Sequence, residues 1–264
     1  AEQLIIQHDD IALAIIDVVM ETQHAGLELV KTIRQQLKNR RMRLVLRTGQ
    51  PGEAPEEHVI RDYDINDYWT KSELSADRLQ TILTTNLRSY QQISNIANAK
   101  RGLQLFNNER LECFHCHDGH LFTDSVRDRS MRVVETPFHN TGLYNIDGLG
   151  AYPEPNTGAH EVTGRAAEMG AFRAPSLRNV AVTAPYMHDG SIATLEEVIR
   201  TYAAGGRNII EGELSGDGRR NPYKDSFIVG FSISEEEIAD VIAFLNSLTD
   251  EQLLIDSRYG NPFE

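Results

Sequence analysis

Two cysteines and a histidine lie together near the middle of the chain, in the stretch LECFHCHDGH. Cys113 and Cys116 are three positions apart, and His117 follows directly. This Cys-x-x-Cys-His spacing is typical of c-type haem attachment, because the two thiols reach the two vinyl groups on one edge of a porphyrin. The imidazole of His117 then lies under the ring and binds the iron. The sequence therefore predicts one covalent haem c held by Cys113, Cys116 and His117.

Two other kinds of site could use these cysteines. A Cys-x-x-Cys redox pair has no use for His117 and lacks the preceding strand–helix context of thioredoxin-like proteins. A zinc site needs four ligands, which His115 and His120 could complete only in a cramped geometry. We therefore expect His115 and His120 to be solvent-side neighbours of the haem and not ligands.

The compartment follows from the haem. Covalent haem c is assembled outside the cytoplasm, so we expect a periplasmic or otherwise exported protein. The chain starts at Ala1 without an apolar targeting segment, as a mature N-terminus left after signal cleavage would.

A helix is expected downstream, in the stretch SIATLEEVIRTYAAGG. Thr194 followed by Glu197 is a capping box, and the glycine pair at 205–206 ends the helix. The apolar side chains share one face at positions i, i+3, i+4 and i+7: Leu195, Val198, Ile199 and Tyr202. From this periodicity alone, Tyr202 is better explained as a core tyrosine bonded to a backbone carbonyl than as a metal ligand.

Two rival ligands for the far side of the iron precede that helix. Met187 and His188 lie in the loop RAPSLRNVAVTAPYMHDG, and a thioether or an imidazole would each complete a low-spin haem. The residue pattern alone leaves the choice between these side chains and Tyr202 open.

Composition limits the classes of function. The 264 residues include 26 basic and 39 acidic side chains, which gives a formal net charge of −13. Nucleic-acid binding is not expected, because a phosphate-binding surface needs clustered Lys and Arg; a basic protein partner would be attracted. No apolar run approaches the length of a membrane span. With two cysteines in one motif, a long-range disulfide framework is excluded.

The fold class predicted is mainly α, with two parts. Residues 1–95 form a helical N-terminal region without a haem motif, because residues 10–37 and 72–93 carry apolar side chains at helical spacing. Residues 96–264 form a cytochrome c-like haem domain, with helices in AKRGLQLF and SEEEIADVIAFLNSL. Trp69 is the single tryptophan; a redox relay is conceivable, but packing is favoured for a large aromatic side chain.

Several longer motifs resemble one protein family. LFNNERLECFHCHDGHLFTDS, FHNTGLYN, FRAPSLRNVAVTAPYMHDGSIATLEEVIRTYAAGG and GFSISEEEIADVIAFLNSLTDE follow one another in the same order as in the C-terminal haem domain of the bacterial di-haem cytochrome c peroxidase and MauG family. The similarity is greatest to its MauG and MbnH branch. It covers about residues 97–251 and is not visible over the first 95.

The resemblance implies further ligands. In this family the sixth iron ligand lies on the helix after the TAPYMHDG loop, fourteen residues beyond the loop histidine, which corresponds to Tyr202. Peroxidase members carry methionine there and MauG-like members tyrosine; Met187 is then a packing residue. The family also binds calcium through backbone oxygens that correspond to Thr183 and Pro185, and carbonyl oxygens suit that hard cation.

The resemblance also implies a function. His–Tyr coordination lowers the reduction potential of the iron, and MauG-like proteins pass oxidising equivalents from peroxide to a residue of a partner protein. The second, peroxide-binding haem has no counterpart here, since no cysteine precedes Cys113. We therefore expect a c-type cytochrome that transfers single electrons and serves a redox partner, one that carries a second haem or an oxidisable tryptophan. The alternatives are a peroxidase acting at its own haem, and a haem-containing subunit of a homo- or hetero-oligomeric assembly.

Overall fold

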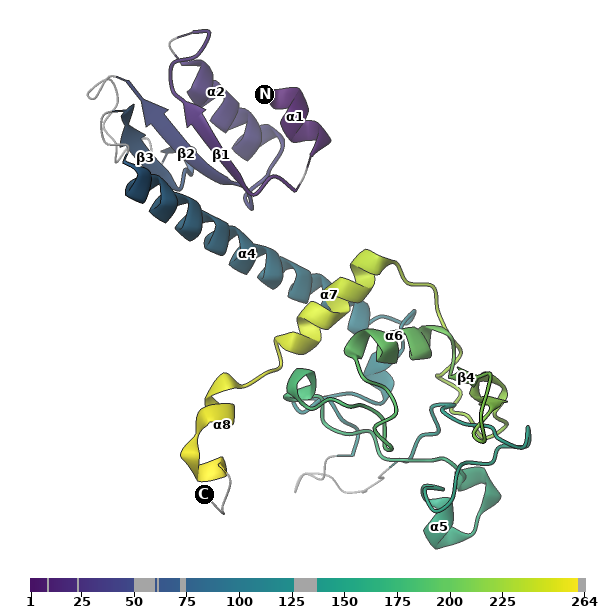
Figure 1. Cartoon of the computed structure of the whole chain (residues 1–264). Coiled ribbons are helices and arrows are strands. Elements are labelled where there is room, and N and C mark those ends of the chain that lie inside the picture. The colour runs from purple at the N-terminus through teal and green to yellow at the C-terminus, as the bar shows by residue number, and fades with distance from the viewer. Residues whose placement is uncertain are drawn as a thin grey trace. The chain divides into compact units, whose positions relative to one another are not determined.

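The computed structural model describes residues 1–8, 10–22, 24–49, 60, 62–71, 75–125 and 137–260. It divides into two compact units, Ala1–Ala97 and Asn98–Glu264. Figure 1 shows the chain coloured along its length. Within the described residues, no helix combines the length and the apolar composition that crossing a bilayer requires.

Unit 1 is built on a parallel sheet. Its order is β1-β2-β3, formed by Leu13–Asp17, Arg43–Thr48 and Asp67–Thr70, with both pairs parallel. The helical segments are α1 (Glu2–Gln7), α2 (Ala25–Lys31) with a continuing π-helical turn (Thr32–Gln36), and the beginning of α4 (Ala76–Phe106).

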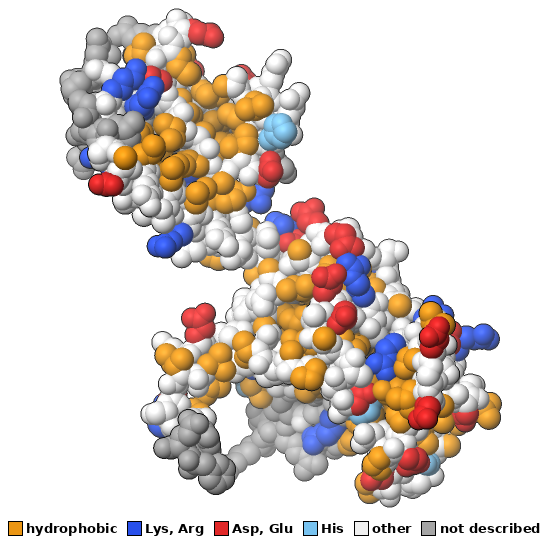
Figure 2. All heavy atoms as spheres, in the orientation of Figure 1, with side chains coloured by type: hydrophobic (Ala, Val, Ile, Leu, Met, Phe, Trp, Pro, Cys, Tyr) orange, Lys and Arg blue, Asp and Glu red, His pale blue; other side chains and the backbone are white. Residues whose placement is uncertain are grey.

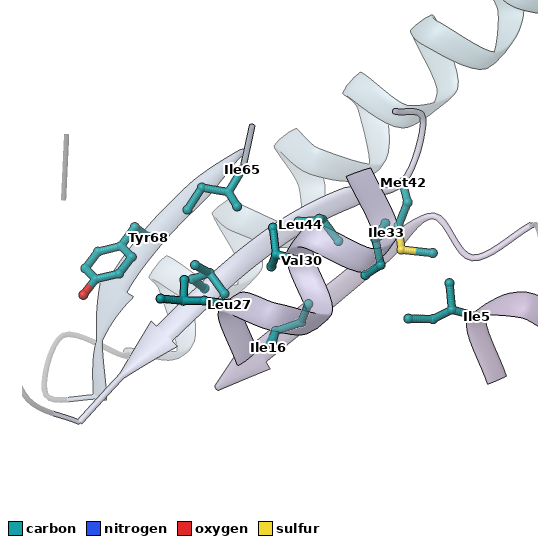
Figure 3. Packing of buried hydrophobic residues seen from close by; sticks show 10 residues of the cluster. Ile5, Ile16, Leu27, Val30, Ile33, Met42, Leu44, Ile65 and Tyr68 are labelled. Atoms are coloured by element: carbon teal, nitrogen blue, oxygen red, sulfur yellow. The ribbon is translucent and has the colours of Figure 1, made fainter. Parts of the chain in front are cut away.

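Both faces of this sheet are covered. Leu44 and Leu46 of β2 pack with Val30 and Ile33 from the α2 side, as Figure 3 shows for most of this cluster. Val45, which points to the opposite face because side chains alternate along a strand, packs with Ile82 of α4. Trp69 is 2% exposed in that second cluster, so packing is its role in the structure.

The prediction of a helical N-terminal region is only partly correct. Residues 25–36 and those from Ala76 onward are helical as expected, but residues 13–17 form a strand, and strands 43–48 and 67–70 were not predicted. Strands buried on both faces read as continuous apolar runs without the period-two alternation. A short run such as Leu-Ala-Ile-Ile therefore fits a helix or a strand equally well.

Unit 2 is mostly short helices and loops. It contains the end of α4, α5 (His160–Thr163), α6 (Leu195–Ala203), α7 (Glu235–Asn246) and α8 (Glu251–Ile255). A two-stranded ladder, β4 (Asn208–Ile209) with β5 (Gly216–Asp217), and several 3₁₀ turns complete it: Cys113–His115, Ala166–Glu168, Val180–Val182, Gly218–Arg220 and Ser257–Tyr259. The predicted helix at AKRGLQLF is the last part of α4.

The crossing of α4 and α7 depends on a glycine. A Cβ atom on Gly102 would collide with the backbone carbonyl of Asp240, so only glycine permits this approach. Next to it, Arg101 donates to both carboxylate oxygens of Asp240 at 2.7 Å. Phe106 packs on Phe244 with ring centroids 5.2 Å apart. Gly102 and Phe106 thus bring the two helices predicted in this domain into close contact.

Candidate haem site

The Cys-x-x-Cys-His motif lies on a tight helical turn after α4. Cys113–His115 is a 3₁₀ turn, and the His117 amide donates to the Cys113 carbonyl at 3.1 Å. Residues four apart on a helical turn share a face, so this turn places Cys113 and His117 on one side. Both cysteines are half-buried and neither is in a disulfide, which leaves two thiols free for covalent attachment.

The His117 ring is oriented for one particular nitrogen to bind a metal. Its Nδ1 lies 3.1 Å from the carbonyl oxygen of Phe122; since a carbonyl only accepts, Nδ1 carries the proton and Nε2 holds the lone pair. Burial lowers the pKa of His117, which favours the neutral imidazole that a metal requires. A ligating histidine fixed by such a second hydrogen bond is the usual arrangement around protein-bound metals. This donor set fits a haem iron.

The Cys113 thiol is a poor candidate for a zinc or redox site. Burial raises the pKa of the Cys113 thiol to about 12, and the reactive form in either site would be the thiolate. His120 is exposed as expected. His115 differs from expectation: it is half-buried, stacked on Phe227 with ring centroids 3.9 Å apart, and paired with Glu112 at 2.6 Å. Phe227, which is remote in sequence, shields it from solvent together with the adjacent Phe114.

Tyr202 lies on α6, whose start is as predicted. The Thr194–Glu197 capping box is present in full. Burial raises the pKa of Tyr202, and the neighbouring groups of Cys116, Cys113 and Tyr152 add smaller contributions in the same direction. The fold therefore brings the Tyr202 phenol into the electrostatic surroundings of both haem-motif thiols, although it is 86 positions from Cys116.

The rival ligands make other contacts. Met187 packs against the apolar cluster of Leu143, Tyr144, Tyr152 and Ile192. His188 stacks on Phe172 with ring centroids 3.7 Å apart and planes 14° from parallel. Thr183 and Pro185, the residues of the expected calcium site, lie on the exposed loop before Met187.

One charged group beside the motif was missed by sequence reasoning. His139 lies between two carboxylates, with Nδ1 2.6 Å from Asp225 Oδ2 and Nε2 2.6 Å from Asp124 Oδ2. The hydrogen bond with Asp225, with smaller contributions from Cys116 and Asp124, raises the pKa of His139 to about 11. The Asp124 amide also donates to the Cys116 carbonyl at 3.0 Å. A cationic His139 thus pins the loop that follows the haem motif. The only sequence signal was its place in FHNTGLYN.

A second group of charges lies in unit 1, where its parallel strands end. Asp17, the last residue of β1, accepts from Lys71 at 2.7 Å and from Arg47 at 3.1 Å. These two hydrogen bonds outweigh partial burial and lower the pKa of Asp17. The cluster holds the carboxyl ends of the strands together by charge.

Comparisons with known proteins find relatives of two kinds. A segment of 103 residues is 52% identical to 3'3'-cGAMP-specific phosphodiesterase 2 of Vibrio cholerae, covering 39% of this chain and 20% of that protein. The methylamine utilization protein MauG of Methylophilus methylotrophus is 32% identical over 198 residues, 67% of this chain and 50% of that protein. No family model matches.

A solved structure is also similar. The crystal structure of a MauG-like protein associated with microbial copper homeostasis is 51% identical, with a TM-score of 0.62, over 63% of this chain and 48% of that one. The haem-motif part of this chain belongs to the MauG and di-haem cytochrome c peroxidase family. The chain spans about half or less of the length of each of these relatives. Membership of the family therefore does not by itself give this chain the activity of the whole relatives.

Proposed function

We propose that this protein is an exported c-type cytochrome that transfers single electrons through one covalent haem, whose iron His117 and Tyr202 would bind. In this proposal it serves a peroxide-linked oxidation in which the peroxide reacts at a haem of a partner protein. The expected calcium ion at the carbonyls of Thr183 and Pro185 would brace the loop before α6.

The observation that carries the proposal is the state of His117. Its Nδ1 is already bonded to the Phe122 carbonyl, so the one remaining ring nitrogen is the iron-binding one, beside two unpaired half-buried thiols. Tyr202 supports the second axial position: both cysteines contribute to its raised pKa. A phenolate ligand stabilises the oxidised iron more than a thioether does.

Each protein group has a defined task. Cys113 and Cys116 fix the porphyrin edge, and the Phe122 carbonyl holds the tautomer and direction of the His117 imidazole. Phe106, Phe122 and Phe244, whose rings pack within 6.1 Å of one another, exclude water from the motif. When bound, the haem would supply an iron ion that can gain or lose one electron.

Unit 1 gives the chain a partner-binding part in this proposal. Its parallel sheet is unlike a helical haem domain, so we infer that unit 1 replaces the second haem domain and is not a decayed copy of one. The 103 residues matched to the phosphodiesterase are close in number to the 97 of unit 1, which favours a module shared with a signalling enzyme. Figure 2 shows acidic and basic side chains together over the α6–α7 region of unit 2, where Glu196 and Glu235 pair with Arg200.

The test is the optical spectrum of the ferric holoprotein before and after one equivalent of hydrogen peroxide, with Tyr202→Phe alongside. The wild-type spectrum should be low-spin and unchanged by peroxide, because both axial positions are filled. Tyr202→Phe should become high-spin and react. Tyr186→Phe is the matched control, since the Tyr186 hydroxyl donates only to the Val180 carbonyl, and it should behave as wild type.

Two results would contradict the proposal. A high-spin wild-type spectrum that shifts at once with peroxide would make the chain a peroxidase at its own haem. A low-spin spectrum that survives Tyr202→Phe would remove Tyr202 as the ligand and reopen Met187 and His188.

A further inference from the structure

Three tyrosines in the apolar cluster beside α6 differ in what their hydroxyl groups donate to. Tyr152 donates to the amide oxygen of Asn140 at 2.8 Å, and Tyr186 donates to the Val180 backbone carbonyl at 3.1 Å. Tyr144 donates to a carboxylate, Asp189 Oδ2, at 2.6 Å. Amide and peptide oxygens are very weak bases, whereas a carboxylate can accept and keep a proton. Of the three, Tyr144 alone has a proton acceptor at its hydroxyl.

This difference decides which ring can lose an electron. Removing one electron from a phenol makes its O–H strongly acidic, so oxidation is easiest where the proton can leave in the same step. The hydrogen bonds to Tyr144 and Ser191 outweigh partial burial and lower the pKa of Asp189, which therefore is ionised at neutral pH and ready to accept. Tyr152 and Tyr186 have no comparable partner.

Tyr144 packs against Tyr152 near α6. Their rings meet edge to face with centroids 5.4 Å apart, within the range of directly packed aromatic pairs. The apolar cluster that contains both tyrosines also packs against Val198 of α6, one turn before the proposed iron ligand Tyr202. Tyr144 and Tyr152 thus lie beside the helix that carries Tyr202.

Tyr144 also lies close to solvent. The Tyr144 ring is buried, but the guanidinium of Arg207 lies over it at 4.6 Å from the centroid, and both Arg207 and Asp189 are half-buried. One layer of charged side chains separates Tyr144 from the outside, so a reductant docked over Asp189 and Arg207 would be near the ring.

We propose that Tyr144 is a redox-active residue that passes electrons from an external donor to the oxidised haem, with Asp189 as its proton acceptor. In the first step Tyr144 gives one electron, through Tyr152, to the haem of this chain after the peroxide-oxidised haem of the partner has taken an electron from it, and the phenol proton moves to Asp189 Oδ2. In the second step the neutral tyrosyl radical takes one electron from the donor, and the proton returns from Asp189 to the phenol oxygen. This role rests on the proposed function, because the haem supplies the oxidant.

The test generates the radical without relying on turnover. The holoprotein is oxidised in a light flash with tris(bipyridine)ruthenium and persulfate, frozen, and examined by electron paramagnetic resonance. A tyrosyl signal should persist in the wild type, because the radical is most stable on the tyrosine whose phenol proton can move to a nearby base. Tyr144→Phe and Asp189→Asn should each reduce the long-lived signal at least about fivefold. Tyr186→Phe, which removes a hydroxyl bonded to a carbonyl, should leave it unchanged.

The outcomes separate this role from the haem ligation. An undiminished signal in Tyr144→Phe would overturn the assignment of the radical, and an undiminished signal in Asp189→Asn would overturn the role of the carboxylate. Neither result would alter the low-spin optical spectrum that tests His117 and Tyr202. Conversely, a high-spin wild-type spectrum would contradict the proposed function while the radical measurement still identified the redox-active tyrosine. Unchanged optical spectra in both variants would show that they retain the fold.

Discussion

The two units are stabilised in different ways. Unit 1 has two apolar clusters, one on each face of a parallel sheet, and Val30, Ile33 and Leu44 of the larger one are fully buried. Unit 2 also has two apolar clusters, which lie among short helices and loops instead of on a sheet. One contains Cys113 of the haem motif, and the other contains Tyr144 with Tyr152.

The difference indicates where each unit obtains its stability. Burial of apolar area is the main favourable contribution to folding. In unit 1 the two clusters pack on a hydrogen-bonded sheet, whereas in unit 2 the larger cluster includes Cys113, which would hold the haem. Unit 2 is rich in turns, caps and loop hydrogen bonds, which each contribute about 1 kcal/mol net. We therefore expect unit 2 to depend on its covalent haem for stability and unit 1 to be indifferent to it. Trp69, the single tryptophan, reports on unit 1 alone.

The largest effect should follow the double substitution Cys113→Ser and Cys116→Ser. Without thioether bonds the haem is lost on denaturing gels, and unit 2 should lose most of its protection in amide hydrogen exchange. The denaturant midpoint followed by Trp69 fluorescence should not change. Equal protection of unit 2 in the wild type and the double variant would show that the haem contributes little to its fold.

An intermediate effect is expected from Leu44→Ala, which removes a fully buried side chain from unit 1. Leu→Ala substitutions in cores cost about 2–5 kcal/mol. The free energy of unfolding obtained from the urea transition, followed by Trp69 fluorescence, should therefore fall by that amount. The exposed Leu254→Ala is the control and should cause a much smaller change. The haem spectrum should be the same in both variants. A change in that spectrum with Leu44→Ala would mean that the two units do not behave independently.

The smallest effect concerns pH and His139. Its folded-state pKa is raised, chiefly by Asp225, to about 11, well above the ordinary value near 6.5. The stabilisation is therefore complete below about pH 6.5 and is lost as pH rises toward 11. Unfolding of unit 2, followed by the haem absorbance, should become easier between pH 7 and 10 in the wild type.

The control is His139→Gln, which can still donate a hydrogen bond but carries no charge. Its unit 2 stability should vary less with pH over the same interval and should be lower than that of the wild type at pH 7. Identical pH profiles for the two proteins would show that His139 is not the group responsible.

Local signals in the sequence predicted the helix starts and the haem motif. The capping boxes Thr194–Glu197 and Ser234–Glu237 are both formed, because each involves residues within one turn. The haem motif is equally local: three residues in five positions define the chemistry. The apolar stripe of α6 correctly placed Tyr202 at the end of that helix, although its role as a ligand came from family resemblance and is still a prediction.

Local signals could not predict which distant segments pair with one another. Strand Leu13–Asp17 was mistaken for helix because its partner, Arg43–Thr48, begins 30 residues later, and a short apolar run carries no record of what it pairs with. The charged group at His139 likewise joins residues 15 and 86 positions away.

The sequence by itself determined the cofactor chemistry and the helix starts, because both depend on residue types at fixed short spacings. Only the tertiary structure decided that unit 1 is an α/β sheet, that His139 is clamped by Asp124 and Asp225, and that Tyr144 donates to a carboxylate while Tyr152 does not. These features depend on which distant segments come into contact, and burial and charge pairing set their energies only after the chain has folded.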